Sequence, residues 1–122
     1  MNRNWYAVAL LLFLSIALWG AGSYLQNSTH QLNSALDHAY YLAESENYTD
    51  AQREFQAAAQ LAERCSNVWV LVIRRNLIDQ LNQTLATLPA YTSKDNFADL
   101  SVETARAKTQ IRQIKQSFFG WF

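Results

Sequence analysis

Apolar residues are distributed unevenly along the 122-residue chain. The stretch from Trp5 to Leu25 contains no charged residue and is apolar or aromatic almost throughout. As a helix rising ~1.5 Å per residue it is roughly 31 Å long, which matches the ~30 Å hydrocarbon slab of a bilayer. Aromatic rings such as that of Trp19 favour the headgroup region. We therefore predict a membrane-spanning helix over residues 5–25, which includes Trp5, Leu11, Leu18, Trp19 and Leu25.

A cleaved secretory signal is the alternative interpretation of the same residues, because the small residues Gly20, Ala21 and Gly22 resemble a cleavage site. The apolar run is longer than the apolar core of about 7 to 15 residues found in such signals. An apolar row with a spacing of seven residues also continues beyond it, through Leu11, Leu18, Leu25, Leu32 and Ala39. We therefore expect the segment to stay attached and its helix to continue to about Ser45.

The basic residues predict the orientation of the span. Arg3 precedes it, whereas residues 23–52 contain no Lys or Arg. Because the cation-rich flank of a span stays in the cytoplasm, residues 1–4 are expected to be cytoplasmic and residues 26–122 extracytoplasmic. This predicts a single-pass protein of the plasma membrane.

A second helix is expected to begin at Thr49, because Thr49 followed by Gln52 fits a capping box. Its apolar stripe, with spacings of three and four residues, runs to about Cys65. Ser66 and Asn67 can cap a third helix. No Gly or Pro forces a break there, so the second and third helices could also be continuous.

The segment Val68–Ile73 is apolar at every position, and we expect it to be the most buried part of the domain. The third helix should end at Leu88-Pro89, because the residue before a proline avoids the helical conformation. A last helix should begin near Asp95, with apolar residues spaced by three and four as far as Phe118.

The periodicity predicts an all-α fold, because no stretch alternates with period two for long enough to form a strand. Helices of similar length joined by short loops favour an antiparallel up-down bundle of three to four helices, into which the membrane helix continues. The residues expected to anchor its core are Phe55, Trp69, Ile78, Leu81, Ile111 and Ile114.

An up-down topology returns the C-terminus to the membrane surface. There the chain carries Lys115, followed by the aromatic residues Phe118, Phe119, Trp121 and Phe122. Cations followed by aromatic rings suit an interfacial anchor, with the rings at headgroup depth. The alternative is that these rings close the end of the core.

Charge is unevenly distributed, although the net charge is zero. Residues 26–63 carry six acids and one base, whereas residues 104–122 carry four bases and no acid. We expect the acidic early helices and the basic last helix to attract each other within the fold. The pattern is not a basic nucleic-acid footprint, so no nucleic-acid partner is expected.

The residue types that carry chemistry do not form a recognisable set. His30 and His38 are eight residues apart on one helix, too far for one metal ion, and Cys65 is the single cysteine. Glycines at 20, 22 and 120 cannot form a phosphate-binding loop. We expect no catalytic residue, no metal, no cofactor and no small-molecule substrate.

The chain also resembles, over nearly its whole length, an uncharacterised family of short bacterial single-span membrane proteins. The shared features follow an N-terminal anchor and are here Tyr48 with Ala51, Trp69, the pair Ile78-Asp79, Leu85 to Leu88 with Tyr91, and the tail Phe118 to Phe122. Where relatives commonly carry a His and a Glu before the Ile-Asp pair, this chain has Arg75 and Leu77, so a polar site there is not carried over. The resemblance implies a membrane-anchored helical domain in a bacterium and supplies no activity.

Together these patterns indicate a membrane-anchored helical interaction module without catalytic activity. Its expected partners are the lipid bilayer and another membrane protein. The alternative is a structural or assembly subunit that associates with itself through the row of Leu11, Leu18, Leu25 and Leu32.

Overall fold

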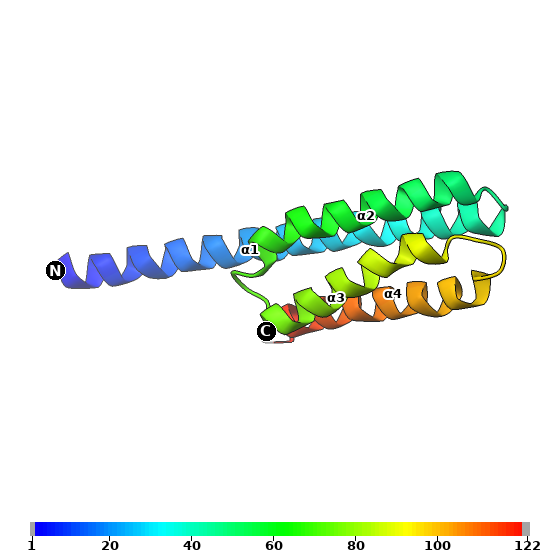
Figure 1. The fold of residues 1–122 in the computed structure, drawn as a ribbon. Coiled ribbons are helices and arrows are strands. Elements are labelled where there is room, and N and C mark those ends of the chain that lie inside the picture. The colour runs from blue at the N-terminus through cyan, green and yellow to red at the C-terminus, as the bar shows by residue number, and fades with distance from the viewer. Residues whose placement is uncertain (1, 121–122) are drawn as a thin grey trace.

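The computed structural model describes residues 2–120, which are almost entirely helical (Figure 1). The described residues form α1 (Asn2–Glu44), α2 (Tyr48–Trp69), α3 (Arg75–Thr87), the 3-10 helix η1 (Leu88–Tyr91) and α4 (Phe97–Phe119). No strand occurs among them, and the helices pack against one another. The predicted all-α bundle is confirmed.

Helix α1 is a single helix of 43 residues that consists of two different halves. Residues 3–20 are exposed on every side, and they extend away from the rest of the molecule (Figure 1). From Ala21 onward one face of the same helix is buried, beginning with Leu25 and Leu32. The expected continuation of the first helix into the bundle is therefore confirmed. Within the described residues, α1 is the one helix long and apolar enough to cross a membrane.

The four helices alternate in direction around a square. Helix α1 contacts α2 and α4, and α3 contacts the same two helices. Among residues 2–120 the backbones of the diagonal pairs, α1 with α3 and α2 with α4, stay farther apart, with no two Cα atoms within 8 Å. Because α2 and α4 run back toward the free half of α1, the α2–α3 connection and the end of α4 lie at the end from which α1 emerges (Figure 1). A membrane crossed by the free half of α1 would lie on this side of the bundle, and for that reason we call it the membrane-facing end.

Apolar side chains from all four helices form one core. Every residue expected to anchor it is buried: Phe55, Trp69, Ile78, Leu81, Ile111 and Ile114. Small buried residues on facing stretches of α1 and α2, such as Ala39, Ala43, Ala51 and Ala58, let these two backbones approach closely. The spacing of three and four residues in the sequence therefore identifies the core face correctly.

A buried hydrogen bond ties α2 to α1 near the membrane-facing end. The indole N–H of Trp69 donates to Ser28 Oγ at 2.9 Å, and the Ser28 hydroxyl donates to the Leu25 carbonyl at 3.1 Å. The ring of Trp69 therefore fills the core while its polar atom stays paired, as a buried indole requires. The Trp69–Ser28 hydrogen bond also fixes the position of α2 along the axis of α1.

The predicted capping box is wrong. Helix α2 begins at Tyr48 with Asn47 as its N-cap residue, so Thr49 lies inside the first turn. The Asn47 side-chain amide instead donates to the Asp50 carboxylate at 2.8 Å. The reason lies in the preceding turn, where Glu46 adopts a left-handed backbone with φ of 63° and reverses the chain earlier than the sequence pattern suggests.

The predicted break between the second and third helices is also misplaced. Helix α2 continues past Ser66 to Trp69, and α3 begins only at Arg75. The chain reverses within the apolar segment 68–73, which was expected to be the most buried part. Trp69 and Ile73 are buried, but the other four residues are exposed. That expectation is wrong because a reversal at the end of the bundle turns only part of its side chains inward.

One buried hydroxyl offers a test of the core. Thr104 Oγ1 on α4 is buried without a hydrogen-bond partner among the described residues. An unpaired buried polar atom is costly, so Thr104→Val should raise the free energy of unfolding by about 1 kcal/mol, measured by chemical denaturation in detergent. The matched control is Thr84→Val, which removes a hydroxyl that donates to the Gln80 carbonyl at 3.1 Å. If Thr104→Val lowers stability as much as Thr84→Val, the packing described here is wrong.

Candidate functional site

A hollow of about 690 Å³, lined mostly by residues with polar or charged side chains, lies between α1 and α4. Its α4 wall includes Lys108, Arg112, Lys115 and Phe119, which are spaced by four, three and four residues and therefore share one helix face. The rest of its lining is Asn33, Asp37, Thr109 and Gln116. The hollow is thus a strip along the side of the bundle, with its long axis parallel to the helices.

A second hollow, of about 510 Å³, continues the first toward the free half of α1. It is lined by Ser15, Leu18, Trp19, Gly22, Ser23, Gln26 and Phe119. Phe119 lines both hollows, so they meet at this ring.

Both hollows lie along the same face of α1. The lining residues at positions 15, 19, 22, 26, 33 and 37 are spaced by three, four or seven residues, which places them in one strip of the helix. From Ser15 to Asp37 this strip rises roughly 33 Å at ~1.5 Å per residue. We call the combined feature the α1–α4 groove.

Close contact between α1 and the end of α4 shapes the middle of the groove. Gly22 leaves room for the Phe118 ring, because a Cβ atom there would lie 3.1 Å from Phe118 Cε1. Phe118 is only 6% exposed, and Phe119 meets its ring edge to face at a centroid distance of 5.1 Å. Phe118 therefore fills the core, while Phe119 lines the groove.

The polar half of the groove carries positive charge. At its upper end Asp37 on α1 forms an ion pair with Lys108 on α4. This is the one ion pair between acidic α1 and basic α4 among residues 2–120, so it alone represents the expected attraction between these helices. In the described part of the chain Arg112 and Lys115 have no carboxylate within 4.0 Å. Two cations therefore remain available to a negatively charged ligand.

The predicted site residues separate into three environments. In the predicted span, Trp5, Leu11, Leu18 and Trp19 are exposed on the free half of α1, whereas Leu25 is buried in the bundle. In the predicted C-terminal anchor, Lys115 and Phe119 line the groove and Phe118 belongs to the core. Trp121 and Phe122 lie outside the described residues.

The residues with metal-binding or nucleophilic side chains are scattered. His30 and His38 are both exposed on α1, and His38 Nδ1 lies 3.7 Å from Glu54 Oε2. Cys65 is a free and buried thiol. Among residues 2–120 no group of three or more His, Cys, Asp or Glu residues is arranged to hold a metal ion.

Comparison with protein families assigns the bundle. The model of a domain of unknown function, DUF4363, matches residues 20–118. The chain belongs to the DUF4363 family. The matched range begins where α1 enters the bundle and ends at Phe118, so the DUF4363 domain coincides with the bundle. No match was found among curated proteins or among solved structures.

The two glycines of α1 give a matched test of how this DUF4363 protein positions its groove. Gly22→Leu should push the Phe118 ring away and cost about 1 to 3 kcal/mol through overpacking. Gly20→Leu makes the same chemical change where nothing lies within 4 Å, so it should leave the bundle intact. Thermal unfolding of the two variants, followed by circular dichroism in detergent, measures the difference. Equal stability would mean that α4 does not pack against Gly22.

Proposed function

We propose that this chain is a membrane-anchored, non-catalytic interaction module whose α1–α4 groove binds a helix of another membrane protein. The observation that supports this proposal is the continuity of the groove along one face of α1, from Ser15 to Asp37. Because the lower half lies beside the predicted span and the upper half beside the bundle, one partner helix could occupy both without bending.

The periodicity of the walls favours a helix as the occupant. Both walls present residues at spacings of three and four, which is the repeat that a third helix needs for ridges-into-grooves packing. Small exposed residues such as Ser15 and Ser23 in the lower half permit the close approach that helices use inside membranes.

The charge of the groove specifies the chemistry of that helix. Its lower half is apolar and aromatic around Leu18, Trp19 and Phe119. Its upper half carries Arg112 and Lys115, which pair with no carboxylate among residues 2–120. The matching partner is a membrane-spanning helix that carries acidic side chains within the first few turns outside the bilayer. Such acidic residues would pair with Arg112 and Lys115 and would fix the register of the two helices.

The proposed location follows from the long apolar helix and the charges around it. We place residues 5–25 across the plasma membrane, residues 1–4 in the cytoplasm and the bundle outside the cytoplasm. Arg3 at one end of the apolar run, and the absence of Lys and Arg from residues 23–52 at the other, support this orientation.

Self-association through the heptad row is the second candidate. In the row proposed for it, Leu25 and Leu32 are already buried within one chain, whereas Leu11 and Leu18 are exposed on the free half of α1. A dimer of this kind would have to form within the bilayer alone. The groove extends through both compartments, which is why we favour a different partner protein.

Site-specific photocrosslinking in native membranes tests the proposal. A crosslinking amino acid at Thr109, which lines the groove, should form an adduct with a distinct membrane protein. The same amino acid at Gln56, exposed on α2, should not form it. An adduct between two copies of this chain would support self-association instead. Equal adducts at both positions, or none at Thr109, would contradict the groove.

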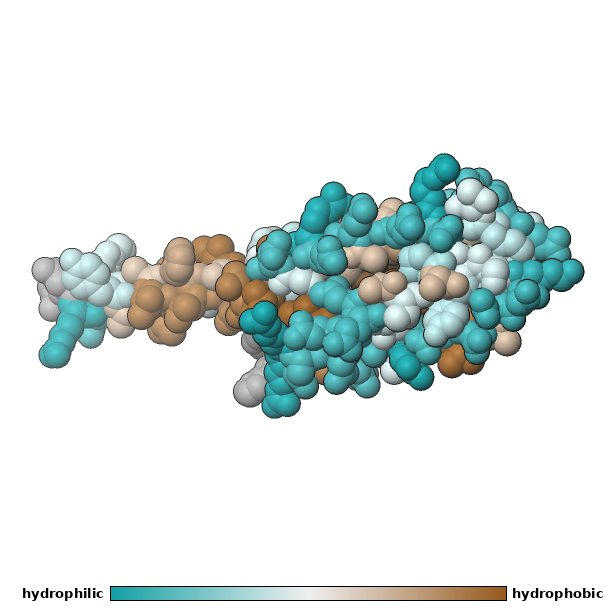
Figure 2. Space-filling view, viewed as in Figure 1, coloured by the Kyte–Doolittle hydropathy of each residue, from teal (hydrophilic) through white to brown (hydrophobic). Residues whose placement is uncertain are grey.

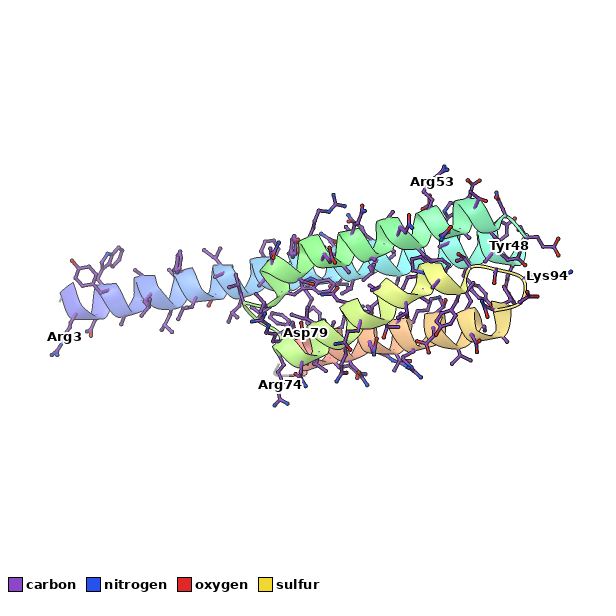
Figure 3. All side chains as sticks on the ribbon, in the orientation of Figure 1. Arg3, Tyr48, Arg53, Arg74, Asp79 and Lys94 are labelled. Atoms are coloured by element: carbon purple, nitrogen blue, oxygen red, sulfur yellow. The ribbon has the colours of Figure 1, made fainter. Side chains whose placement is uncertain are left out.

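A charge reversal shows whether such an adduct depends on the cations. Arg112→Glu with Lys115→Glu should abolish the Thr109 adduct, because the partner's acidic residues would then be repelled. Arg53→Glu with Lys94→Glu is the control, since it makes the same change in net charge at the opposite end of the bundle (Figure 3). The control should retain the adduct.

A further inference from the structure

The connection between α2 and α3 has an unusual composition for a turn. It exposes Val70, Leu71 and Val72 in succession, and Leu71 is 80% exposed. Turns at protein surfaces are ordinarily rich in Gly, Pro, Asn, Asp and Ser, and exposed runs of apolar residues mark sites of interaction. We call these three residues the apolar turn.

The apolar turn lies at the membrane-facing end of the bundle. Trp69, the residue before it, is hydrogen bonded to Ser28 of α1. Because α2 runs antiparallel to α1, the turn comes to lie beside the residues of α1 that precede Ser28 (Figure 1). The hydrophobic surface of the free half of α1 continues onto this end of the bundle (Figure 2).

The length of the predicted span determines how deep the membrane-facing end of the bundle lies in the bilayer. The apolar run over residues 5–25 is roughly 31 Å long and fits the bilayer, but the bundle already begins at Ala21. The last five residues of the run, or roughly 7 Å of helix, therefore belong to both the span and the bundle. If the whole run lies within the bilayer, the membrane-facing end reaches the interfacial region.

The backbone of the apolar turn is suited to an environment of low polarity. The N–H groups of Val70, Leu71 and Val72 donate to the carbonyls of Ser66, Val68 and Trp69, at 3.0, 3.1 and 3.0 Å. Unpaired N–H and C=O groups make irregular backbone costly in lipid. These N–H groups are paired, so the exposed side chains can enter the interface while the three N–H groups remain hydrogen bonded.

Cations border the apolar turn. Arg74 follows it after Ile73 and lies at the membrane-facing end (Figure 3), and Arg64 is exposed on α2, six residues before Val70. Arg75 faces Asp79 at 4.0 Å, so it is partly neutralised. Apolar side chains flanked by arginines match the boundary between acyl chains and lipid phosphates.

We propose that the apolar turn inserts into the interface of the same bilayer that α1 spans and forms a second contact of the bundle with lipid. Two separated contacts fix the rotation and tilt of the bundle, which a single helix does not. The turn connects α2 to α3, whereas the groove lies between α1 and α4, so this lipid contact does not depend on the proposed partner.

The experiment uses the purified full-length protein in liposomes, where no partner is present. A polarity-sensitive fluorophore is attached to Leu71→Cys on a Cys65→Ala background, and quenching by lipids brominated near the headgroup is compared with quenching by aqueous iodide. Val102→Cys, at an aliphatic residue on α4 that is 59% exposed, is the matched control, and Ile16→Cys reports on the span. The label at Leu71 should be quenched by the brominated lipids, and iodide should quench it several-fold less than the label at Val102.

Each other outcome overturns the proposal. Equal access of iodide to Leu71 and Val102 would place the turn in water. Protection from iodide without lipid quenching would mean that the turn contacts protein, such as a second copy. Lipid quenching at neither Leu71 nor Ile16 would show that α1 does not span the bilayer, and the proposed function would lose its basis. Lipid quenching at Ile16 alone would refute the lipid contact of the turn and leave the groove unaffected.

Discussion

The hydrogen bonding of the α1 backbone is the constraint on which the rest of the structure depends. A chain that crosses lipid must pair its own N–H and C=O groups, and α1 does this by remaining one helix for 43 residues, through the apolar run and into the bundle. A helix without an interruption has no hinge. The direction of the apolar half therefore sets the direction of the bundle. In a bilayer, the depth of the apolar run would determine how far the α2–α3 connection lies from the membrane surface.

The same continuity lets two neighbouring faces of α1 serve different purposes. One face carries Leu25 and Leu32 and is buried in the core, where the Trp69–Ser28 hydrogen bond fixes the position of α2 along the axis of α1. Among the described residues only the end of α4, at Phe119, reaches the lower half of the adjacent face, and α4 forms only one wall of its upper half. Because both faces follow the heptad repeat, a helix seated in the α1–α4 groove would extend the packing of the bundle rather than disturb it.

The sequence was sufficient for what depends on periodicity. The continuation of the first helix into the bundle and the six core anchors follow from spacings of three, four and seven residues. The segment 68–73 was misjudged because an apolar run without period fits either a core or a lipid surface, and periodicity does not distinguish these environments. The groove was missed because the α4 cations were assigned to attraction within the fold. Their spacing at positions 108, 112 and 115 was the available signal, but only Lys108 reaches a carboxylate on α1.

The rigidity of α1 in a bilayer is the most direct test of this account. Spin labels at Val8→Cys and Tyr41→Cys, both exposed positions, on a Cys65→Ala background in lipid nanodiscs report the distance between the two halves of the helix by pulsed dipolar spectroscopy. An unbroken helix predicts a narrow distribution centred near a separation of about 50 Å, from ~1.5 Å per residue. A clearly shorter mean, or a broad distribution, would show a hinge between span and bundle and would contradict the account.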